Sequence, residues 1–490
     1  MATTKRSLTA RVAAGLGAAA FATLTVLGGA LPASAAPNIV APTDPPPSIT
    51  IHKHEQPAVP GPVGTGSPTD PVAGDPIDGV VFTIERVESL DVFDNADWAM
   101  LPTLTATDVI DDDVAYPLGA PVTATTGADG VGTGAVTTVV ELGVYLVREF
   151  STPAGAGIVI ESAPFLVVVP QPQVVGNVTD WNYNVHVYPK NTVANVVKST
   201  PPAVQQGLGS TVPWTITTNA PIASQGTAVT SYAIQDVLDP RLDYVEDSAV
   251  VTVGGSTLTT PTDYTITPLA GAGGTLVVNF TDPAGLQALE DANGGQVVLT
   301  FDTTVVSLTA PGEPTGVIDN IGSVFVNDSQ IDSNTVTDYW GGIEIKKVDD
   351  DAQNPEALAG AKFRVYLTTD LLFEHPIAIN GVSEWTSDAN GIVTIHGLRT
   401  NQAGTLEYVF REVAAPAGYT LGGTTSWTLP VVSGTDAEIE LQVVNPQVRP
   451  YELPLTGGSG EAAFMIGGFG LLTIAIGTAL IRRRKAQAEH

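Results

Sequence analysis

The sequence predicts an all-β protein made of three tandem β-sandwich domains. From Ser48 onward, short alternating or β-branched runs are separated by Gly, Pro, Asn and Asp, which is typical of sandwich strands. The length of 490 residues corresponds to about three domains. Helical patterns are scarce. The central part of the chain contains one convincing short helix, which we expect to be capped by Asp282, to hold Pro283 in its first turn and to end at 293–295.

The N-terminus has the three parts of a secretory signal peptide, predicted at residues 1–35. Lys5, Arg6 and Arg11 precede a long apolar run at 12–30, and small residues lead to a cleavage site after Ala35. The length of the run leaves an uncleaved anchor as an alternative, but the Pro-rich segment that follows favours removal. We expect this segment, residues 36–47, to form an extended and mobile arm.

The C-terminal segment, residues 450–490, contains a short motif, an apolar run at 462–481 and a basic cluster. The run has no charged residue and is long enough to cross a bilayer as a helix, with the basic cluster on the cytoplasmic side. In this order the three parts resemble the cell-wall sorting signal of Gram-positive surface proteins, in which a sortase cuts between Thr456 and Gly457. An ordinary single-pass membrane protein is the alternative. The motif is Leu453, Pro454, Leu455, Thr456 and Gly457, and the cluster is Arg482, Arg483, Arg484 and Lys485.

Charge and cysteine content exclude several classes of function. Seven of the 20 basic and two of the 51 acidic residues lie in the two ends predicted to be removed, which leaves 13 basic and 49 acidic residues and a net charge of −36. Such an acidic chain excludes nucleic acid as a partner. The absence of cysteine excludes disulfides, thiol nucleophiles and cysteine-ligated zinc.

An internal repeat relates the first predicted domain to the third. Four features occur in the same order in both: an opening strand, a second strand, a hairpin turn and a Tyr-containing strand. We therefore place domain one at 48–191, domain two at 192–340 and domain three at 341–449. The matching pairs are 49–55 with 343–349, 79–84 with 360–365, Asp129-Gly130 with Asn390-Gly391, and 145–149 with 408–412.

Lysine is rare between the two ends of the chain, and several lysines lie in the opening strand of a predicted domain. Lys53 has the strand parity of Ile49 and Ile51, and Lys347 has the parity of the isoleucines that precede it, so both amines point toward the core side. A charged amine there is costly unless it is neutral or bonded. The lysines are Lys53, Lys190, Lys198, Lys346, Lys347 and Lys362.

Domain three resembles the Cna B-type domain, an immunoglobulin-like sandwich that forms an internal Lys–Asn isopeptide bond. Residues 408–419 resemble its E-box, and 443–445 resemble its closing strand. The resemblance implies a bond between Lys347 and Asn445, with Glu412 as the group that shuttles protons and Lys346 as the alternative nucleophile. Burial favours this chemistry, because it lowers the pKa of a lysine and raises the pKa of a carboxyl group.

The same resemblance implies a bond in each of the other domains. Domain one repeats the set as Lys53, Glu149 and Asn191, but it departs from the box at Ser151-Thr152 and Ala156, so whether this bond forms stays open. Domain two resembles the middle domain of pilus shaft subunits, in which an aspartate replaces the glutamate. The matching residues there are Lys198, Asp236 and Asn327, with Asn320 as a rival acceptor.

Residues 181–190 resemble the pilin motif, whose lysine is the acceptor in sortase-catalysed polymerisation. Pro189 ends the strand and is expected to leave Lys190 exposed at the domain junction. In the resemblance, Lys190 attacks the thioester that a sortase makes with Thr456 of another subunit. The alternative is that Tyr-Pro-Lys merely ends a strand. The matching residues are Trp181, Val185, Tyr188, Pro189 and Lys190.

Together these motifs resemble the major pilins, or fimbrial shaft subunits, of Gram-positive bacteria, of the Actinomyces fimbrillin kind. The resemblance implies an exported, wall-attached structural subunit that supports adhesion and is not an enzyme, apart from its single-turnover self-crosslinking. Its implied partners are a pilus-specific sortase, copies of itself, a tip pilin and, through a housekeeping sortase, peptidoglycan, while the receptor on host or bacterial surfaces stays open. The alternatives are a monomeric wall-anchored adhesin, which has no use for the Lys190 motif, and a basal or minor pilin.

We expect no cofactor and no metal site. The acidic triplets at 111–113 and 349–351 are able to bind calcium, but acidic loop tips are more often simply solvated. His52, His54 and His186 lack metal-ligand partners at useful spacing. No Ser-His-Asp set, phosphate loop or catalytic dyad is visible in the sequence.

Overall fold

The computed structural model describes residues 38–449, except 41, 60, 63, 69, 71, 176–177, 224–227, 268, 270 and 435–438, and separate positions between 465 and 478. The predicted signal peptide at 1–35 and the motif Leu453–Gly457 lie outside these residues. The described part is built mostly of strands in several sheets, which confirms the predicted all-β multidomain fold.

Domain one opens and closes with strands that run side by side in the same direction. Strand β1 pairs in parallel with β11, and the short β2 pairs in parallel with β12. The sheet β11-β1-β5 packs against the sheet β4-β3-β6-β8 around a shared apolar core. The strands are β1 (Ser48–His52), β2 (His54–Glu55), β3 (Val81–Arg86), β4 (Val122–Thr125), β5 (Ala135–Val139), β6 (Gly143–Ser151), β7 (Ile158–Ile160), β8 (Phe165–Val169), β9 (Gln171–Val175), β10 (Val178–Asn182), β11 (Asn184–Val187) and β12 (Lys190–Val193).

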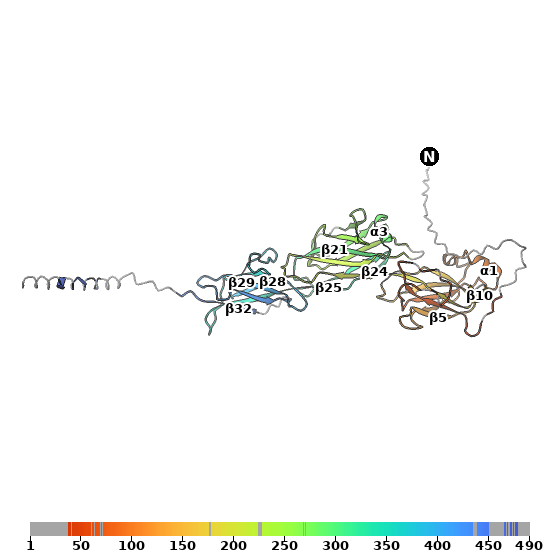
Figure 1. Cartoon of the computed structure of the whole chain (residues 1–490), viewed down its shortest axis with the longest axis horizontal. Coiled ribbons are helices and arrows are strands. Elements are labelled where there is room, and N and C mark those ends of the chain that lie inside the picture. Colours follow the sequence, from red (N-terminus) through yellow and green to blue (C-terminus); the bar gives the residue numbers. More distant parts are fainter. Residues whose placement is uncertain are drawn as a thin grey trace, which may run out of the picture.

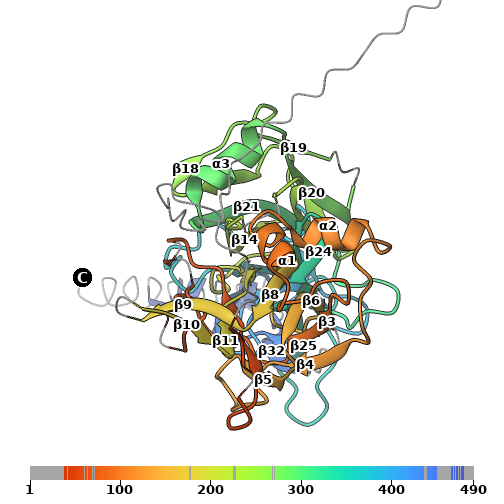
Figure 2. The same cartoon turned by 90° about the vertical axis from the view of Figure 1, so that its right-hand side faces the viewer.

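A second apolar cluster lies under a helical insertion between β3 and β4. The insertion contains α1 (Asn95–Met100) and α2 (Ala106–Asp111), which the sequence analysis missed because each has only six residues. Its apolar residues pack with Leu146 and with Ile39. Figure 2 shows α1 and α2 beside β6 and β8. The predicted mobile arm is therefore wrong in part: Ile39 is buried, and the backbone N–H of Val40 donates to the Tyr183 hydroxyl.

Domain two consists of the sheet β13-β14-β21-β17-β18 packed on the sheet β19-β20-β15-β23-β24. Its helix α3 (Ala284–Ala292) confirms the predicted short helix, and Asn293 ends it in a left-handed conformation. The cap was wrong by one residue, since Pro283 and not Asp282 precedes the first turn. The strands are β13 (Val197–Ser199), β14 (Thr211–Asn219), β15 (Tyr232–Leu238), β16 (Leu242–Tyr244), β17 (Val250–Val253), β18 (Ser256–Thr257), β19 (Tyr264–Ile266), β20 (Gly274–Phe280), β21 (Gln296–Val305), β22 (Val317–Asn320), β23 (Gly322–Val326) and β24 (Ser329–Asp332).

Domain three is joined to domain two by a continuous strand. The start of β25 pairs with β22, and the rest of it pairs with β28 and, in parallel, with β32. The sheet β27-β26-β29-β30 packs on the other side of the core. The strands are β25 (Val336–Asp349), β26 (Lys362–Tyr366), β27 (Trp385–Thr386), β28 (Ile392–Thr400), β29 (Glu407–Ala414), β30 (Ser426–Pro430), β31 (Val432–Ser433) and β32 (Ile439–Asn445).

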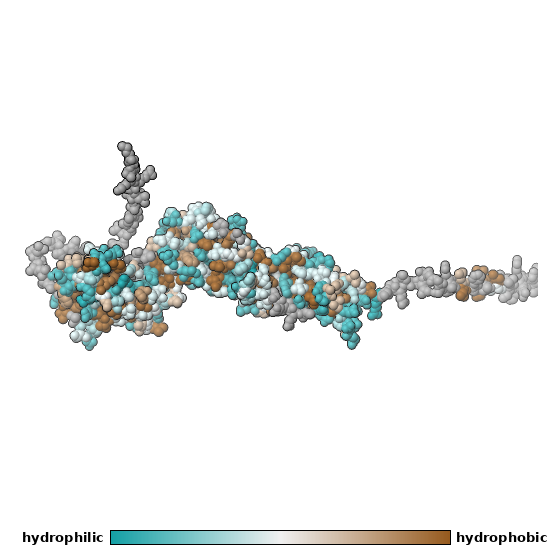
Figure 3. All heavy atoms as spheres, turned by 180° about the vertical axis from the view of Figure 1, so that it is seen from behind, coloured by the Kyte–Doolittle hydropathy of each residue, from teal (hydrophilic) through white to brown (hydrophobic). Residues whose placement is uncertain are grey.

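The three domains lie in a row. Figure 1 shows β5 and β10 in the first body, β21 and β24 in the second, and β28, β29 and β32 in the third. Apolar side chains of the second and third bodies belong to one continuous cluster of buried residues. Polar and apolar residues are interspersed over the face seen in Figure 3, as on most globular domains.

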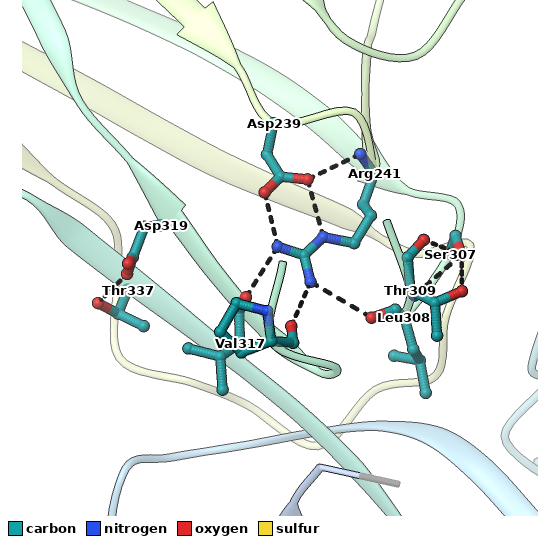
Figure 4. A network of polar contacts seen from close by, with 9 residues as sticks. Asp239, Arg241, Ser307, Leu308, Thr309, Val317, Asp319 and Thr337 are labelled. Carbon is teal, nitrogen blue, oxygen red and sulfur yellow. Dashed lines mark hydrogen bonds and ion pairs between the residues drawn. The ribbon is translucent and has the colours of Figure 1, made fainter. Parts of the chain in front are cut away.

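A buried arginine holds together the part of domain two that leads into β22. Arg241 is 1 % exposed, and its guanidinium forms a two-point ion pair with Asp239, at 2.8 and 2.6 Å. It also donates to the carbonyl oxygens of Pro314 and Val317, at 2.7 and 2.8 Å. Figure 4 shows this network closing the loop before β22. Because every one of these acceptors is fixed by the buried cation, β22 enters domain two in a defined position.

The described positions between 465 and 478 are helical. Within the described residues, no helix is both long enough and apolar enough to cross a membrane. The predicted membrane segment at 462–481 lies largely outside the described residues and stays a prediction.

Candidate functional site

Domain three brings a lysine, a glutamate and an asparagine together in its core. Lys347, Glu412 and Asn445 are at most 1 % exposed. The Asn445 side-chain amide donates to Oε1 of Glu412 at 2.7 Å, and the Lys347 amine lies 3.9 Å from the same oxygen. Lys347 also donates to the backbone carbonyl oxygen of Val443, two residues before Asn445, at 2.9 Å. The predicted alternative, Lys346, points away from this group and donates to the Asn390 carbonyl oxygen.

The surroundings of this set favour neutral groups over charged ones. Burial lowers the pKa of Lys347 to about 8, and Glu412 opposes the shift. Burial also raises the pKa of Glu412, while Lys347 and the hydrogen bond from Asn445 lower it. Among the described residues, Oε2 of Glu412 and Oδ1 of Asn445 have no hydrogen-bond partner. Burial therefore shifts the equilibrium of the amine and of the carboxyl group toward their neutral forms, next to an amide carbonyl oxygen that has no partner among the described residues.

Domain one assembles the corresponding set. The Lys53 amine donates to Oε2 of Glu149 at 2.9 Å and to Oδ1 of Asn191, and the Asn191 amide donates to Oε1 of Glu149 at 2.6 Å. Burial lowers the pKa of Lys53 to about 8 although Glu149 opposes the shift. Ser162 was missed in the sequence analysis. Its hydroxyl donates to Glu149 at 2.8 Å and accepts from Lys53 at 3.0 Å, and nothing in its local sequence marked it.

The two sets have the same strand register. In domain one, Asn191 on the last strand lies opposite Glu55, two residues after Lys53 on the first. In domain three, Asn445 lies opposite Asp349, two residues after Lys347. The acids are also equivalent, because Glu149 pairs with Phe82 and Glu412 pairs with Phe363. The departures from the box at Ser151-Thr152 and Ala156 therefore leave the strand register of the three residues unchanged, although the Lys53 amine lies closer to its glutamate, at 2.9 Å, than the Lys347 amine does, at 3.9 Å.

Domain two buries Lys198 against Asp236. The amine is within hydrogen-bond distance of Oδ2 of Asp236, and the rings of Trp214 and Phe301 flank it at 5.1 and 5.2 Å. Burial lowers the pKa of Lys198 and raises that of Asp236 to about 6, with the attraction between the two opposing both shifts. Asn320, at the end of β22, is 1 % exposed and lies beside Asp236, whose pKa its side chain lowers.

The predicted acceptor Asn327 does not reach this set. It lies in the turn between β23 and β24 with a φ of 52°, and its side chain bonds to Thr230, Ser231 and Ala228 at the surface. Its left-handed backbone turns the side chain out of the sheet. The rival acceptor Asn320 occupies the buried position instead, and neither of its amide atoms has a hydrogen-bond partner in the described part of the chain.

The acceptor lysine of the second predicted site is less exposed than expected. Lys190 begins β12, is half-buried, and donates from its amine to the Ala73 carbonyl oxygen at 2.7 Å. Burial lowers its pKa to about 8. The partner carbonyl comes from a loop far away in sequence, which is why strand parity alone did not reveal it. The other motif residues lie nearby: Val185 is in the core, Trp181 packs against Trp98, and Tyr188 and Pro189 lead directly into Lys190.

No group of three metal-ligating side chains is placed to hold a metal ion among the residues that the structure describes.

Three family profiles together match almost the whole described chain. Residues 47–192 match a Gram-positive pilin subunit D1 N-terminal domain, residues 192–339 match the Sgo0707 N2 domain, and residues 341–447 match a prealbumin-like fold domain.

Several known proteins are similar to this chain over most of its length. Fimbrial subunit type 2 of Actinomyces naeslundii is 30 % identical over 90 % of both chains, and fimbrial subunit type 1 of Actinomyces viscosus is 29 % identical over 98 % of both. Among solved structures, the full-length major pilin SpaD of Corynebacterium diphtheriae has a TM-score of 0.67 and 29 % identity. This match covers 82 % of this chain and 98 % of that one.

Proposed function

The chain belongs to the family of Gram-positive fimbrial subunits. On this premise we propose that it is polymerised through Lys190 and stabilised by an isopeptide bond in each domain. As a structural subunit of a pilus shaft, it must transmit force along a row of domains. A covalent bond between the first and last strand of a domain carries that force before the hydrogen bonds of the sheet do.

The proposed bond formation uses only groups of the chain itself. The neutral Lys347 amine attacks the Asn445 side-chain carbonyl carbon while the protonated Glu412 donates to the carbonyl oxygen. Glu412 then carries a proton from the former amine to Nδ2. The C–Nδ2 bond breaks, ammonia leaves, and the carbonyl re-forms as its oxygen returns its proton to Glu412. The lowered pKa of Lys347, the raised pKa of Glu412 and the bond between Glu412 and Asn445 support these roles. Fixed contact in the folded core supplies the effective concentration.

The same roles extend to the other domains. In domain one we assign the nucleophile to Lys53, the proton shuttle to Glu149 and the acceptor to Asn191. In domain two we assign them to Lys198, Asp236 and Asn320, with Asn320 replacing the predicted Asn327. Each assignment is supported by burial of all three side chains. In domain one Glu149 contacts both partners, and in domain two Asp236 contacts Lys198 and its pKa is lowered by Asn320.

The polymerisation step is supported by the position of the Lys190 amine, which a hydrogen bond holds near the junction of domains one and two. Its lowered pKa also favours the nucleophilic form. We assign to it the attack on the thioester carbonyl carbon that a pilus-specific sortase forms with Thr456 of a neighbouring chain. An amide forms, the sortase thiolate leaves and the proton of the amine passes to it. The chain is thus a substrate of the sortase and not an enzyme.

The remaining assignments follow from the two ends of the chain. We propose export through the signal peptide 1–35, cleavage between Thr456 and Gly457, growth of a homopolymer beneath a tip pilin, and final attachment to peptidoglycan by a housekeeping sortase. The described residues include neither the signal peptide nor the motif Leu453–Gly457, so these steps are supported by the sequence motifs and by family membership.

Replacement of Lys190 in the native host tests the polymerisation step. Wall proteins released by muramidase are separated on a denaturing gel and probed for this chain. We expect a high-mass ladder in the wild type and in Lys362→Arg, whose lysine forms an exposed ion pair with Glu384, and only monomer in Lys190→Arg. A ladder that persists in Lys190→Arg contradicts the assignment of the acceptor. A wild type without a ladder favours the monomeric wall-anchored adhesin.

A further inference from the structure

The outer face of domain one carries two rows of polar side chains that lead to Lys190. Strands β1 and β2 present Ser48, Thr50, His52 and His54 on this face. The facing row consists of Asn184 and His186 on β11, Tyr188 in the link between β11 and β12, and Lys190 at the start of β12. Because both pairs of strands are parallel, the two rows run in the same direction. Ser48 donates to Asn184 at 3.0 Å, and His54 lies opposite Lys190 in the register.

His52 lies at the centre of these two rows of side chains. Its ring stacks on Tyr188, with centroids 4.7 Å apart and planes 13° from parallel, and on His186, with centroids 5.2 Å apart. Its Nε2 shares a hydrogen bond of 2.8 Å with Nδ1 of His186. The three rings are half-buried and lie outside the apolar core, which Ile51 and Val185 fill from the opposite faces of the same strands.

Side chains of these rows also form hydrogen bonds to the loop that contains the hydrogen-bond acceptor of Lys190. The Tyr188 hydroxyl donates to the Ser67 carbonyl oxygen at 2.7 Å. Nδ1 of His54 donates to the Gly74 carbonyl oxygen at 2.9 Å, next to the Ala73 carbonyl oxygen that accepts from Lys190. The Lys190 amine is therefore held in position by a loop that is bonded to Tyr188 of the ring stack near one end and to His54 near the other.

We propose that His52 is a positioning residue for sortase-catalysed polymerisation, because its ring clamps Tyr188 and thereby sets the place of the Lys190 amine. The inference rests on the proposed function of Lys190. His52 itself contributes no atom to the reaction: it fixes Tyr188, the residue before Pro189, on one side, and through the loop it fixes the carbonyl group that accepts from the amine on the other.

The clamp requires neutral imidazole rings. Burial, His186 and His54 lower the pKa of His52 to about 4, and burial lowers the pKa of His186 and of His54. Two rings that share one hydrogen bond and lie near the Lys190 amine repel each other when both are charged. The charged or titratable groups that face them are His54 and Lys190 from β2 and β12, Asp129 from the loop before β5, and Asp70 and Asp75 from the loop over β11.

The test compares three full-length variants in the native host. In His52→Ala the stack is lost, and we expect several-fold less of the chain in the high-mass ladder. In His52→Phe a flat ring remains, and we expect the ladder to stay near the wild-type level. His375→Ala is the control, because His375 in domain three is 84 % exposed, and we expect no change.

A second readout separates positioning from loss of folding. In a strain without the pilus sortase, wall-released monomer is treated with an amine-acylating reagent, and acylation of Lys190 is measured by peptide mass spectrometry relative to Lys362 in the same chain. We expect Lys190 in His52→Ala to be acylated several-fold faster than in the wild type, although it polymerises less.

Specific outcomes overturn the proposal. An undiminished ladder in His52→Ala, or loss of the ladder in a folded His52→Phe chain, contradicts the clamp. Equal acylation of Lys190 in His52→Ala and the wild type contradicts it as well. If the ladder persists in Lys190→Arg, the proposed function itself fails, and this outcome is distinct from failure of the clamp alone.

Discussion

Asn445 donates a hydrogen bond of 2.7 Å from its side-chain amide to Oε1 of Glu412 inside a core that excludes water. The amine of Lys347 on the first strand lies 3.9 Å from the same carboxyl oxygen. Two strands separated by almost the whole domain thus meet at one buried glutamate. Five predictions follow from this site, its counterparts and the contacts that support them.

Removing the acceptor or the shuttle of domain three is expected to prevent its bond. Asn445→Ala and Glu412→Gln should each lose one ammonia fewer per chain than the wild type, measured as the intact mass of the wall-released protein minus the mass calculated from its own sequence. By analogy with a disulfide that closes a loop of about 100 residues, domain three should lose about 4–5 kcal/mol of stability. Asn354→Ala, in an exposed loop of the same domain, should lose as much ammonia as the wild type and keep its melting temperature.

The acceptor of domain two is expected to be Asn320. Relative to the mass calculated from its sequence, Asn320→Ala should lose one ammonia fewer than the wild type. Asn327→Ala should lose as many as the wild type, because the Asn327 side chain bonds to surface groups near Thr230. Peptide mapping for a Lys198–Asn320 cross-link provides the direct measurement. A cross-link to Asn327, or an unchanged loss of ammonia in Asn320→Ala, would refute the assignment.

Blocking the bond is expected to create a pH dependence that the linked domain lacks. In Asn445→Ala the Lys347 amine stays free, with a pKa lowered from 10.5 to about 8. Between these values the unfolded chain binds more protons than the folded one, so stability rises with pH. We expect the melting temperature of domain three in this variant to increase from pH 8 to pH 10 relative to the Lys347→Met, Asn445→Ala double variant. If the melting temperatures of the single and the double variant change equally with pH, Lys347 is not a free, buried amine in Asn445→Ala.

Loss of the ion pair under β22 is expected to destabilise domain two. Asp239→Asn leaves the buried Arg241 guanidinium without its counter-charge, which costs about 3–5 kcal/mol. Because the same guanidinium holds the carbonyl oxygen of Val317, three residues before Asn320, the cross-link of domain two should also form more slowly. Thermal unfolding and time-resolved mass measure the two effects. Asp319→Asn is the matched control, since Asp319 is exposed and bonds only to Thr337 (Figure 4).

The junction of domains two and three is expected to loosen without the Tyr408 hydroxyl. This group accepts from the backbone N–H of Gln206 in domain two at 3.0 Å and donates to the Arg399 carbonyl oxygen in domain three at 2.5 Å. Tyr408→Phe leaves a buried N–H without a partner, which costs about 1–3 kcal/mol. Small-angle scattering should show a wider range of shapes than for Tyr419→Phe, whose ring is half-buried outside the junction. Identical scattering of the two variants would count against a role in rigidity.

Much of the architecture was readable from local pattern. Alternation along 49–53 and 343–347 identified two lysines on the core side, and both are fully buried. The repeat between the first and third domains predicted equivalent positions, and the lysine, acid and asparagine of each domain indeed share one register. These features depend on parity along single strands, which the sequence carries directly.

Features made by distant segments escaped the sequence analysis. Asn320 and Asn327 each close a short β-branched run, and only the fold shows that β22 ends in the core while Asn327 lies in a left-handed turn. The partial burial of Lys190 comes from the Ala73 carbonyl oxygen, more than a hundred residues away in the chain. Ser162 and His52 likewise acquire their contacts across the sheet.

The sequence by itself determined the all-β class, the family resemblance and the residue types able to form the cross-links, because alternation and motif spacing are local properties of the chain. Only the tertiary structure decided which asparagine is buried beside each lysine and acid, and what holds Lys190 in place. Those pairings depend on the register between strands that are far apart in sequence, and register is set by how whole sheets pack and not by any single strand.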